Sequence, residues 1–428
     1  MSEQFDAIVV GAGVAGCTAA YILAQAGLEV LLIERGNNAG SKNMTGGRLY
    51  SHSLEKIIPG FAREAPVERK VVKEKVSFLT PESAVTLDYH SQRLSEQGKN
   101  SYTLLRSEFD QWLAQKAEAA GAVMAAGVRV DDLMIREGRV CGVIAGEDEI
   151  EAGVVILADG VNSLLAQKAG LKNELEPGEV AVGAKEVIGL PSQVIEDRFN
   201  LKEGEGASWL FAGDCTAGRI GGGFIYTNRD SLSLGIVCSL GDIANGEKTV
   251  FQMLEGFEQH PAVQPLIKGG KLLEYSGHLV PEAGYGMIPR LYGDGVVVVG
   301  DAAGFVINIG YMVRGMDLAI ASAEAAAQAV IAAKEKGDFS AQSLSRYRQL
   351  LDESFVMRDL QLYRKFPQFM ENHRIFKDYP QLADDILAEL FRVDGGPAKP
   401  LRTKLMRNLK KVGFKYFLKD VFKGVKAL

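Results

Sequence analysis

Two short apolar runs near the start of the chain are separated by glycines and by a helical stretch. Residues 5–10 and 30–33 consist mainly of Val, Ile, Leu and Ala, and each run has the length of a buried strand. The residues between them, up to Ala26-Gly27, have a helical character. This order predicts a strand, a helix and a parallel strand, which is the βαβ unit of a doubly wound sheet.

Strand-like runs recur later at short spacing and predict a second sheet that is mostly antiparallel. Residues 75–79 and 85–89, joined through Pro81, predict a hairpin. The other expected elements are strands over 128–133, 140–144, 180–188, 207–211, 219–226 and 231–237, a strand from Tyr102 that runs into a helix over 109–120, and one helix over 249–268. Gly221 to Gly223 fall inside a strand pattern, where they indicate either the close approach of a ligand or a flexible bulge.

Two more buried strands lead to an acidic residue. Residues 154–157 lead to Asp159-Gly160, and residues 295–299 lead to Gly300-Asp301. Ligands of parallel sheets bind at the carboxyl ends of the strands, so Asp301 is expected to face a ligand, with a helix over 318–334 behind it. Asp159 has two open interpretations, a carboxylate at the edge of a cofactor cleft or a plain turn.

The C-terminal region is expected to be mostly helical from Phe339 onward, with breaks at Pro367, Pro380 and Pro397 to Pro400. On either side of Gly413, apolar residues recur at helical spacing with lysines and arginines between them. Two short basic amphipathic helices hinged at this glycine are therefore predicted. Such helices can lie on anionic lipid, pack on the protein itself or bind an acidic partner, and the pattern leaves all three open.

The first glycine-rich turn has the spacing of a dinucleotide-binding site. Gly11 permits the tight turn, Gly13 lets the backbone approach a pyrophosphate, and Gly16 lets helix and strand pack closely. The N–H groups at the start of the helix attract the diphosphate. Glu34, at the end of the second strand, can accept hydrogen bonds from a ribose diol, which disfavours NADP at this site. The motif alone does not distinguish FAD from NAD.

The loop over residues 35–48 is a second candidate for ligand contact. Its cations Arg35, Lys42 and Arg48 could face a phosphate, and Gly46-Gly47 would let the backbone touch a flat ring. The alternative is a solvated surface loop.

Composition and charge narrow the class of protein. With 428 residues, 47% hydrophobic and 24% charged, the chain is long enough for two or three globular domains. The net charge of −6 gives no reason to expect a nucleic acid as a partner. The charge is uneven, because residues 401–428 carry nine Lys or Arg and one acid, Asp420, a net of +8 that leaves −14 for residues 1–400.

Cysteine usage and hydropathy suggest a compartment. The four cysteines are scattered, so they predict reduced thiols rather than a disulfide framework or a cluster site. The N-terminus lacks a signal-peptide pattern, and we find no uncharged apolar stretch of about eighteen residues. A cytoplasmic protein without a membrane span is therefore expected.

Four motifs follow one another along the chain, namely the glycine turn with Glu34, Arg106 before a helix, Asp159-Gly160 and Gly300-Asp301. This order resembles the flavoprotein superfamily of aromatic hydroxylases, geranylgeranyl reductases and electron-transfer-flavoprotein:quinone oxidoreductases. More narrowly, the chain from residue 5 to its C-terminus resembles the FixC group of the last family. The stretches that carry this likeness are Lys42 to Tyr50, Ile156 to Ser163, Gly221 to Phe224, His278 to Glu282 and Arg314 to Ile320.

The resemblance implies an α/β fold with a Rossmann-like FAD-binding domain of the glutathione reductase type. We expect this domain to consist of residues 1–65, 101–172 and 285–338. A mostly antiparallel sheet domain for substrate or partner would be inserted as residues 66–100 and 173–284. A helical region, residues 339–428, would end in the basic tail 401–428.

The resemblance also implies FAD as the cofactor, with its ADP half on the glycine turn and Glu34. Asp301 would bond the ribityl chain, and the helix that begins near Gly315 would point at the N1 and C2 carbonyl edge of the flavin. The flavin itself carries the chemistry, so no catalytic side chain and no metal site is expected. The expected cofactor-binding residues are Gly11, Ala12, Gly13, Val14, Ala15, Gly16, Glu34, Arg35, Lys42, Gly46, Gly47, Arg106, Val130, Asp159, Gly160, Gly300, Asp301, Gly315, Met316 and Asp317.

The activity implied by the resemblance is electron transfer between an electron-transfer flavoprotein and a quinone or a ferredoxin-like partner. Because the cysteines have no cluster spacing, an iron–sulfur cluster would belong to a separate ferredoxin-like subunit. Peripheral contact with the inner face of the cell membrane through residues 401–428 is one of the open roles of the tail. The alternatives are a prenyl reductase of the geranylgeranyl reductase kind, an NAD(P)H-dependent FAD hydroxylase, and a flavin-holding subunit that serves as a docking platform.

Overall fold

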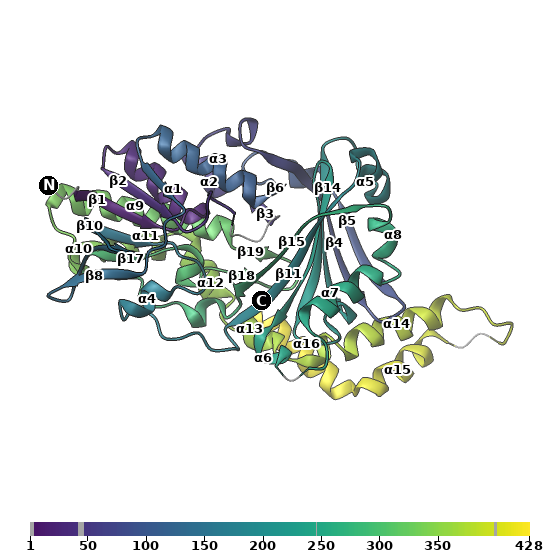
Figure 1. Ribbon diagram of the computed structural model, residues 1–428. Coiled ribbons are helices and arrows are strands. Elements are labelled where there is room, and N and C mark those ends of the chain that lie inside the picture. The colour runs from purple at the N-terminus through teal and green to yellow at the C-terminus, as the bar shows by residue number, and fades with distance from the viewer. Residues whose placement is uncertain (1–3, 42–46, 245, 398–399) are drawn as a thin grey trace.

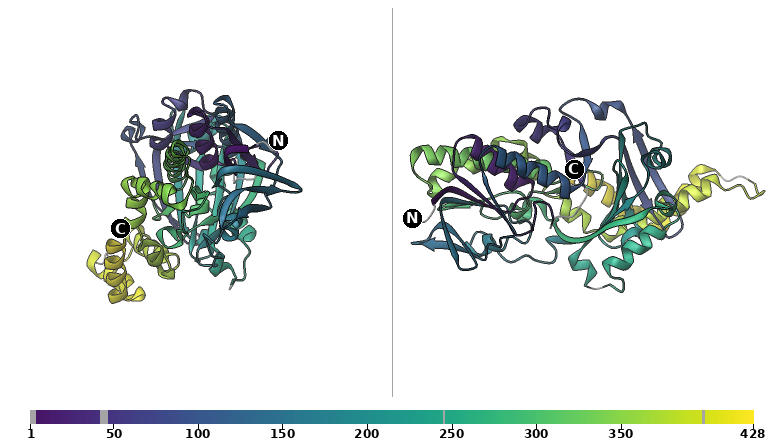
Figure 2. Two further views of the ribbon diagram at one scale, coloured as in Figure 1. Left: turned by 90° about the vertical axis from the view of Figure 1, so that its left-hand side faces the viewer. Right: turned by 45° about the horizontal axis from the view of Figure 1, so that its top comes forward.

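The computed structural model of the protein describes residues 4–41, 47–244, 246–397 and 400–428. The chain forms two large sheets that stand side by side, each accompanied by helices (Figure 1). Two further views show that the last helices of the chain extend past the second sheet (Figure 2). The expected fold class, an α/β protein with a mostly antiparallel second sheet and a helical C-terminus, is confirmed.

The eight-stranded sheet contains the predicted βαβ unit. Its strands are β1 (Gln4–Val10), β2 (Val30–Glu34), β7 (Val123–Ala126), β8 (Asp132–Arg136), β9 (Arg139–Ala145), β10 (Asp148–Leu157), β16 (Tyr292–Gly293) and β17 (Val296–Val298). β1 pairs in parallel with β2 on one side and with β10 on the other, and β10 pairs in parallel with β17. Successive residues of these strands are buried, so both faces of the sheet are covered, as their unbroken apolar sequences predict.

One predicted strand of this sheet is wrong. Residues 128–133 are predicted as a strand, but residues 128–131 are irregular and β8 begins at Asp132. Gly127 has a φ of +76°, which ends β7 in a turn. The N–H of Val128 then donates to the carbonyl of Glu34 at 3.0 Å. The segment therefore crosses the carboxyl end of β2 instead of extending a ladder.

Three helices stand beside this sheet. They are α1 (Val14–Gln25), α3 (Arg106–Ala119) and α9 (Met316–Lys336), and α1 packs against both of the others (Figure 1). Among the described residues, α9 is the one helix long and apolar enough to cross a membrane. Its most apolar window is 67% buried inside the protein, which is typical of a core helix.

The second large sheet has nine strands. Its strands are β3 (Gly47–Tyr50), β4 (Val67–Leu79), β5 (Ala84–His90), β6 (Ser101–Leu104), β11 (Val180–Gly189), β12 (Glu205–Gly213), β13 (Gly221–Thr227), β14 (Ser231–Ser239) and β15 (Lys271–Pro281). All pairs are antiparallel except β4 with β12, and β4 with β5 forms the predicted hairpin. β3 pairs with β6, and β6 with β4, so both lie in this sheet although the expected domain division assigns their residues to the FAD-binding domain.

A helical layer packs on one face of this sheet. It contains α5 (Ser192–Phe199), α7 (Val250–Gln259) and α8 (Gln264–Ile267). The prediction of one helix over 249–268 is wrong, because α7 ends before His260. That residue precedes Pro261 and has extended backbone angles, as the proline ring requires.

The remaining elements are short or belong to the C-terminal region. They are α2 (His52–Ile57), α4 (Leu164–Lys168), α6 (Leu240–Ile243), the two-stranded β18 (Ile307–Asn308) and β19 (Val313–Arg314), α10 (Ala341–Leu344), α11 (Arg346–Glu353), α12 (Phe355–Leu362), α13 (Phe366–Met370), α14 (Asp378–Phe391), α15 (Leu401–Val412) and α16 (Phe414–Ala427). The predicted hinge at Gly413 is confirmed, with a φ of +85° between α15 and α16. Pro367 and Pro380 lie in the first turns of α13 and α14, so they begin helices rather than break them.

The tail helices turn a polar side inward. Asp420 of α16 is buried and accepts hydrogen bonds from Arg374 Nε at 2.8 Å and from Tyr379 Oη at 2.5 Å. Burial alone would raise the pKa of Asp420, but these donors hold it at about 2. The apolar side chains of α16 consequently face outward, with Phe422 66% and Val425 71% exposed.

We expect Asp420→Asn to loosen α16 from the protein body. The change removes charge-assisted hydrogen bonds worth roughly 2 kcal/mol, so the amides of α16 should exchange with solvent faster at neutral pH. Because the folded pKa is depressed, the same contribution in the unchanged protein is present above about pH 4 and is lost as the pH falls towards 2. Hydrogen exchange read by mass spectrometry measures this, and Lys419→Gln is the control. Equal exchange in the two variants would contradict the role of Asp420.

Candidate functional site

A cavity of about 1070 Å³ lies between the two sheets. Its walls come from the carboxyl ends of β1, β2 and β10, from the start of α9 and from one face of the nine-stranded sheet. The predicted site residues that line it are Gly11, Gly13, Val14, Ala15, Glu34, Arg35, Gly47, Arg106, Val130, Asp159, Gly160, Asp301, Gly315 and Met316. The fold thus brings together residues that lie up to three hundred positions apart.

Four of the described site residues do not line this cavity, and two predicted ones fall outside the description. Lys42 and Gly46 lie outside the described residues. Ala12, Gly16, Gly300 and Asp317 stand behind the lining. A side chain at Gly300 would press on Ala15, so this glycine shapes the wall rather than forming its surface.

The glycine turn is held by close backbone contacts. Gly11 has a φ of +103°, and a Cβ there would overlap the carbonyl of Ala158 at the end of β10. A Cβ on Gly16 would overlap the carbonyl of Gly11. Gly13 caps α1 and lines the cavity, so the free N–H groups at the start of this helix are directed into it.

Glu34 is positioned by two backbone donors. Its Oε2 accepts from the N–H of Ala12 at 2.9 Å, and its Oε1 accepts from the N–H of Gly36 at 2.6 Å. These bonds fix the carboxylate at the cavity wall and leave further lone pairs on both oxygens. The arrangement fits the recognition of a diol.

Arg106 is a half-buried cation of the cavity wall. Its Nε and Nη2 donate to the two oxygens of Asp110 at 2.8 and 2.7 Å, in a bidentate pair within α3. Asp110 is fully buried, and Gly40 approaches the same turn so closely that a Cβ would overlap the carbonyl of Arg106. The fork geometry fixes the guanidinium beside the cavity.

Two aspartates follow the strands β10 and β17, with a lysine between them. Burial raises the pKa of Asp159 to about 6, and its Oδ1 has no hydrogen-bond partner among the described residues. Burial likewise raises the pKa of Asp301, against the opposing charges of Arg106, His278 and Lys172. Lys172 donates to the carbonyls of Val161 and Ala302 at 3.3 and 3.2 Å. Sequence patterns do not reveal this lysine, because it lies in an irregular segment after α4.

The start of α9 forms another part of the wall. Gly315 and Met316 line the cavity, and the methyl group of Met316 lies near Gly47 of β3. Asp317 is buried and accepts from Arg314 Nε at 2.7 Å, and His52 Nε2 lies 3.1 Å from the same oxygen. Burial acts to raise the pKa of Asp317, but His52 and Arg314 outweigh it and hold the pKa below its usual value.

The nine-stranded sheet presents aromatic and small residues to the cavity. Phe224 and Tyr226 line it with stacked rings whose centroids are 5.2 Å apart. Arg48 lines it as well, and its guanidinium forms a bidentate pair with Glu74 and lies over the ring of Tyr50. This face combines flat apolar surface with a neutralised cation. It suits a planar organic molecule.

From the sequence, the glycines at 221–223 indicate either the close approach of a ligand or a flexible bulge. The structure offers a third explanation. All three line the cavity. The space of a Cβ is taken by the carbonyl of Val237 at Gly221, by the carbonyl of Phe211 at Gly222 and by the ring of Phe257 at Gly223. Close packing inside the sheet therefore accounts for the absence of side chains here.

One carboxyl and one histidine of the cavity are absent from the expected cofactor-binding residues, although both belong to the stretch His278 to Glu282 that carries the family likeness. Glu282 and His278, at the end of β15, both line the cavity, whereas His52, His90, His260 and His373 do not. Burial lowers the pKa of His278. Cys17 is fully buried behind the glycine turn, and burial raises the pKa of its thiol.

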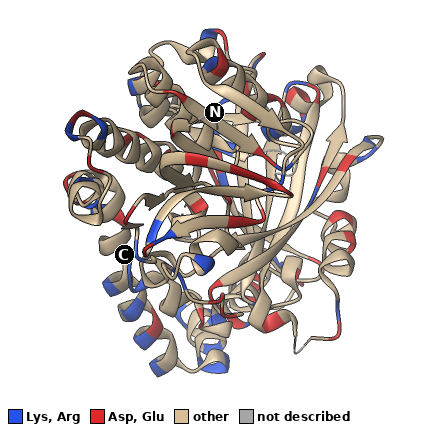
Figure 3. Cartoon of the chain, turned by 60° about the vertical axis from the view of Figure 1, so that its left-hand side comes forward, with Lys and Arg blue, Asp and Glu red and all other residues tan. Residues whose placement is uncertain are grey.

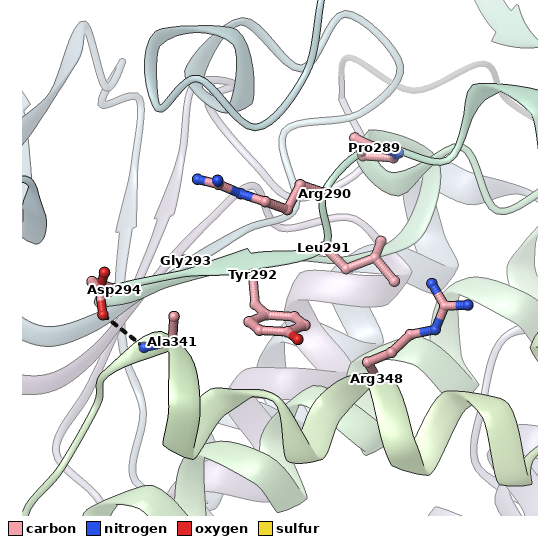
Figure 4. A pocket seen from close by; sticks show the side chains of 8 residues that line it. All are labelled: Pro289, Arg290, Leu291, Tyr292, Gly293, Asp294, Ala341 and Arg348. Carbon is pink, nitrogen blue, oxygen red and sulfur yellow. Dashed lines mark hydrogen bonds between the residues drawn. The ribbon is translucent and has the colours of Figure 1, made fainter.

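A smaller cavity of about 330 Å³ lies near the edge of the eight-stranded sheet (Figure 4). Arg290 and Arg348 line it but extend to opposite sides in this view, and Arg348 is paired with Asp352 at 2.9 Å. The N–H of Ala341 donates to Asp294 at 2.7 Å. These cations do not converge on a common point, so the large cavity is the better candidate.

The donor set of the large cavity fits an extended dinucleotide. Backbone N–H groups at the start of α1 suit a diphosphate, and Glu34 suits a ribose diol. Asp159 and Ser163 line the cavity with a buried oxygen that has no partner among the described residues. Across the described residues there is no group of three or more His, Cys, Asp or Glu placed to hold a metal ion.

Comparison with known families agrees with this architecture. The profile of the FAD binding domain matches residues 4–198, and that of the ETF-QO/FixC family C-terminal domain matches residues 366–428. A protein of Escherichia coli strain K12 named "Probable electron transfer flavoprotein-quinone oxidoreductase YdiS" is 59% identical over 426 residues, covering 100% of this chain and 99% of the relative. Protein FixC of Salmonella typhi is 56% identical over 429 residues and covers 100% of both chains.

Solved structures share the fold at lower identity. A geranylgeranyl bacteriochlorophyll reductase-like protein from Thermoplasma acidophilum has a TM-score of 0.72 and 22% identity, with 96% of each chain covered. A variant of the halogenase PltM in complex with FAD has a TM-score of 0.63 and 16% identity, with 90% of this chain and 80% of that chain covered. The likeness to these structures shows the fold alone, whereas identities of 59% and 56% over the whole chain show the family. The chain belongs to the ETF-QO/FixC family and is a flavin oxidoreductase with an FAD-binding domain.

Proposed function

We propose that the protein binds FAD in the large cavity and transfers electrons between an electron-transfer flavoprotein and a quinone or a ferredoxin-like partner. The observation that carries the proposal is the 59% identity over the whole chain to a relative named as an electron transfer flavoprotein-quinone oxidoreductase. The cavity supports it, because one continuous space reaches from Glu34 to the aromatic face of the second sheet. The rings of Phe224 and Tyr226 offer a flat apolar surface in this cavity for a planar electron acceptor.

Each part of the chain has a role in this proposal. The glycine turn and Glu34 hold the ADP half, and Asp301 holds the ribityl chain. When bound, the FAD supplies the electron chemistry. The start of α9 gives the ring end a positive field, and Phe224 with Tyr226 supplies a surface on which an acceptor can stack.

The partner proteins form the less direct part of the proposal. We infer that an iron–sulfur cluster, if used, is carried by a separate ferredoxin-like subunit, since the four cysteines Cys17, Cys141, Cys215 and Cys238 lie in separate elements. The likeness to a geranylgeranyl reductase-like structure, at 22% identity, is one of fold, so it does not favour prenyl reduction. No observed residue favours hydroxylation.

We also propose that the outward side of the tail rests on the inner face of the cell membrane. Phe414, Tyr416, Val421, Phe422 and Val425 are exposed on α16, and lysines flank them. Lys and Arg gather on the helices near the C-terminus (Figure 3). Outward apolar side chains with flanking cations match the two requirements of anionic lipid, which are burial of hydrocarbon and attraction to phosphate.

We expect Asp301→Ala to weaken the retention of FAD at least tenfold. The change removes a charged partner, and hydrogen bonds to charged groups are worth about 1.5–3 kcal/mol. Equilibrium dialysis or flavin fluorescence measures the affinity, with the exposed Asp148→Ala as the matched control. Unchanged affinity would show that Asp301 does not hold the cofactor.

The electron-transfer function is tested by mixing FAD-loaded protein anaerobically with a reduced cognate electron-transfer flavoprotein, and separately with a quinol. Bleaching of the flavin band by either donor is expected. Persistence of the oxidised spectrum with both donors would overturn the proposed function. NADPH oxidation that depends on an aromatic compound would instead support a hydroxylase.

For the tail, we expect the double change Phe422→Ser and Val425→Ser to reduce sedimentation with phosphatidylglycerol-containing vesicles about tenfold or more. Fully burying one such side chain contributes about 1.5–3 kcal/mol, so the loss of two should lower the affinity for the vesicles more than tenfold. Pure phosphatidylcholine vesicles test the contribution of charge. Leu87→Ser, which alters an equally exposed apolar residue on β5, is the control. If the double variant sediments like the unchanged protein, the tail does not contact lipid in this way.

A further inference from the structure

One carboxyl group that lines the cavity, that of Glu282, is not among the residues proposed above to hold the cofactor. Glu282 directly follows β15, and its N–H donates to the carbonyl of Glu179 at 2.8 Å, which fixes the backbone. Its side chain lines the cavity on the side formed by Asn308, Pro367 and Met370.

The carboxyl of Glu282 is only weakly held. In the described part of the chain its carboxyl accepts one hydrogen bond, a long one of 3.5 Å from Asn308 Nδ2 to Oε2. Asn308 is itself positioned, because its Oδ1 accepts from the N–H of Gly310 at 3.1 Å. A carboxyl with one neutral donor and no cation beside it is poorly stabilised as an anion.

Burial raises the pKa of Glu282 to about 7, and the hydrogen bond from Asn308 opposes this only in part. The same cavity is lined by many other titratable groups, namely Glu34, Arg35, Arg48, Arg106, Arg129, Asp131, Asp159, Lys168, Tyr226, Asp242, His278, Asp301 and Glu371. None of them contributes a charge that shifts the pKa of Glu282. The group can therefore carry a proton at one moment and release it at another under neutral conditions.

We propose that Glu282 is a catalytic acid that delivers a proton to a quinone reduced in this cavity, with Asn308 as its positioning residue. This inference rests on the proposed electron-transfer function. It names the proton source that such an acceptor needs in this cavity.

The proton count leaves one proton for the protein to supply. A quinone becomes a quinol by gaining two electrons and two protons. When bound and reduced by two electrons, FAD would supply two electrons and one proton. The second proton comes from Glu282: its carboxyl O–H bond breaks, an O–H bond forms on the quinone oxygen, and water returns a proton to the carboxylate. In the opposite direction the carboxylate accepts the proton from the quinol.

The test compares two oxidants of FAD-loaded protein that has been reduced beforehand with dithionite. A short-chain, water-soluble benzoquinone needs electrons and protons, whereas ferricyanide accepts electrons alone. In the unchanged protein, oxidation by the quinone should slow as the pH rises through about 7, because the acid form is present below that pH and lost above it. Oxidation by ferricyanide should not follow this profile.

In Glu282→Gln, oxidation by the quinone should be at least tenfold slower at about pH 6 and should lose its pH profile, while oxidation by ferricyanide stays unchanged. Glu282→Asp should retain the profile at a reduced rate. Glu258→Gln is the matched control, because burial also raises the pKa of Glu258, to about 8, but it lies on α7 outside the cavity.

A spectroscopic measurement checks the proton site without turnover. The infrared band of the protonated carboxyl in FAD-loaded protein, followed from about pH 5 to pH 9, should lose a component near pH 7 that is absent from Glu282→Gln and present in Glu258→Gln. A quinone rate and pH profile in Glu282→Gln equal to the unchanged protein would overturn the proposal, as would equal slowing with ferricyanide. In either of those outcomes the quinone still oxidises the protein, so the proposed electron-transfer function stands without a role for Glu282. If the quinone fails to oxidise even the unchanged protein while ferricyanide succeeds, then the proposed quinone acceptor is also wrong.

Discussion

The cofactor site depends on three backbone segments that meet without side chains between them. The carbonyl of Ala158 occupies the place where a side chain of Gly11 would stand, and the carbonyl of Gly11 occupies that of Gly16. The ends of β1 and β10 and the first turn of α1 are therefore locked at a separation that only glycine permits. The parallel register of β10 with β1 and β17 then carries Asp159 and Asp301 to the same edge. Any bulk in this contact would move every cofactor-facing group at once.

The sequence predicts this part well because its signals are local. The alternation of apolar runs and glycines places β1, α1 and β2 within a residue or two, and hairpin β4–β5 is marked by Pro81 and its neighbours. The helix over 249–268 fails because the effect of Pro261 on His260 outweighs an otherwise continuous helical pattern. The strand over 128–133 fails because Gly127 turns the chain across the end of β2.

What the sequence could not predict comes from long-range packing. Lys172 acquires its position from the carbonyls of Val161 and Ala302, the latter 130 residues away, and no periodicity records such a contact. Glu282 belongs to a stretch that resembles the family, yet its raised pKa depends on burial and on Asn308, which lies 26 residues later in the chain. The amphipathic pattern of the tail is visible in the sequence. The sequence does not show which side of the tail faces the protein, because the long-range ion pair of Asp420 with Arg374 holds the polar side of α16 inward.

The first turn of α9 shows how the chain controls charge beside the cavity. A helix N-terminus carries about half a positive charge, and the carboxylate of Asp317 in that turn would cancel it. Arg314 contacts this carboxylate through Nε and Nη2 at 2.7 and 2.6 Å, and its Nη1 contacts Asp359 at 2.6 Å. One guanidinium shared by two carboxylates offsets the charge of Asp317 only in part, and it does so from the side of α12, while Gly315 and Met316 line the cavity at the start of α9. A field fixed in this way needs no rearrangement when the charge of a bound group changes, which is the condition under which preorganised dipoles stabilise a reduced state most effectively.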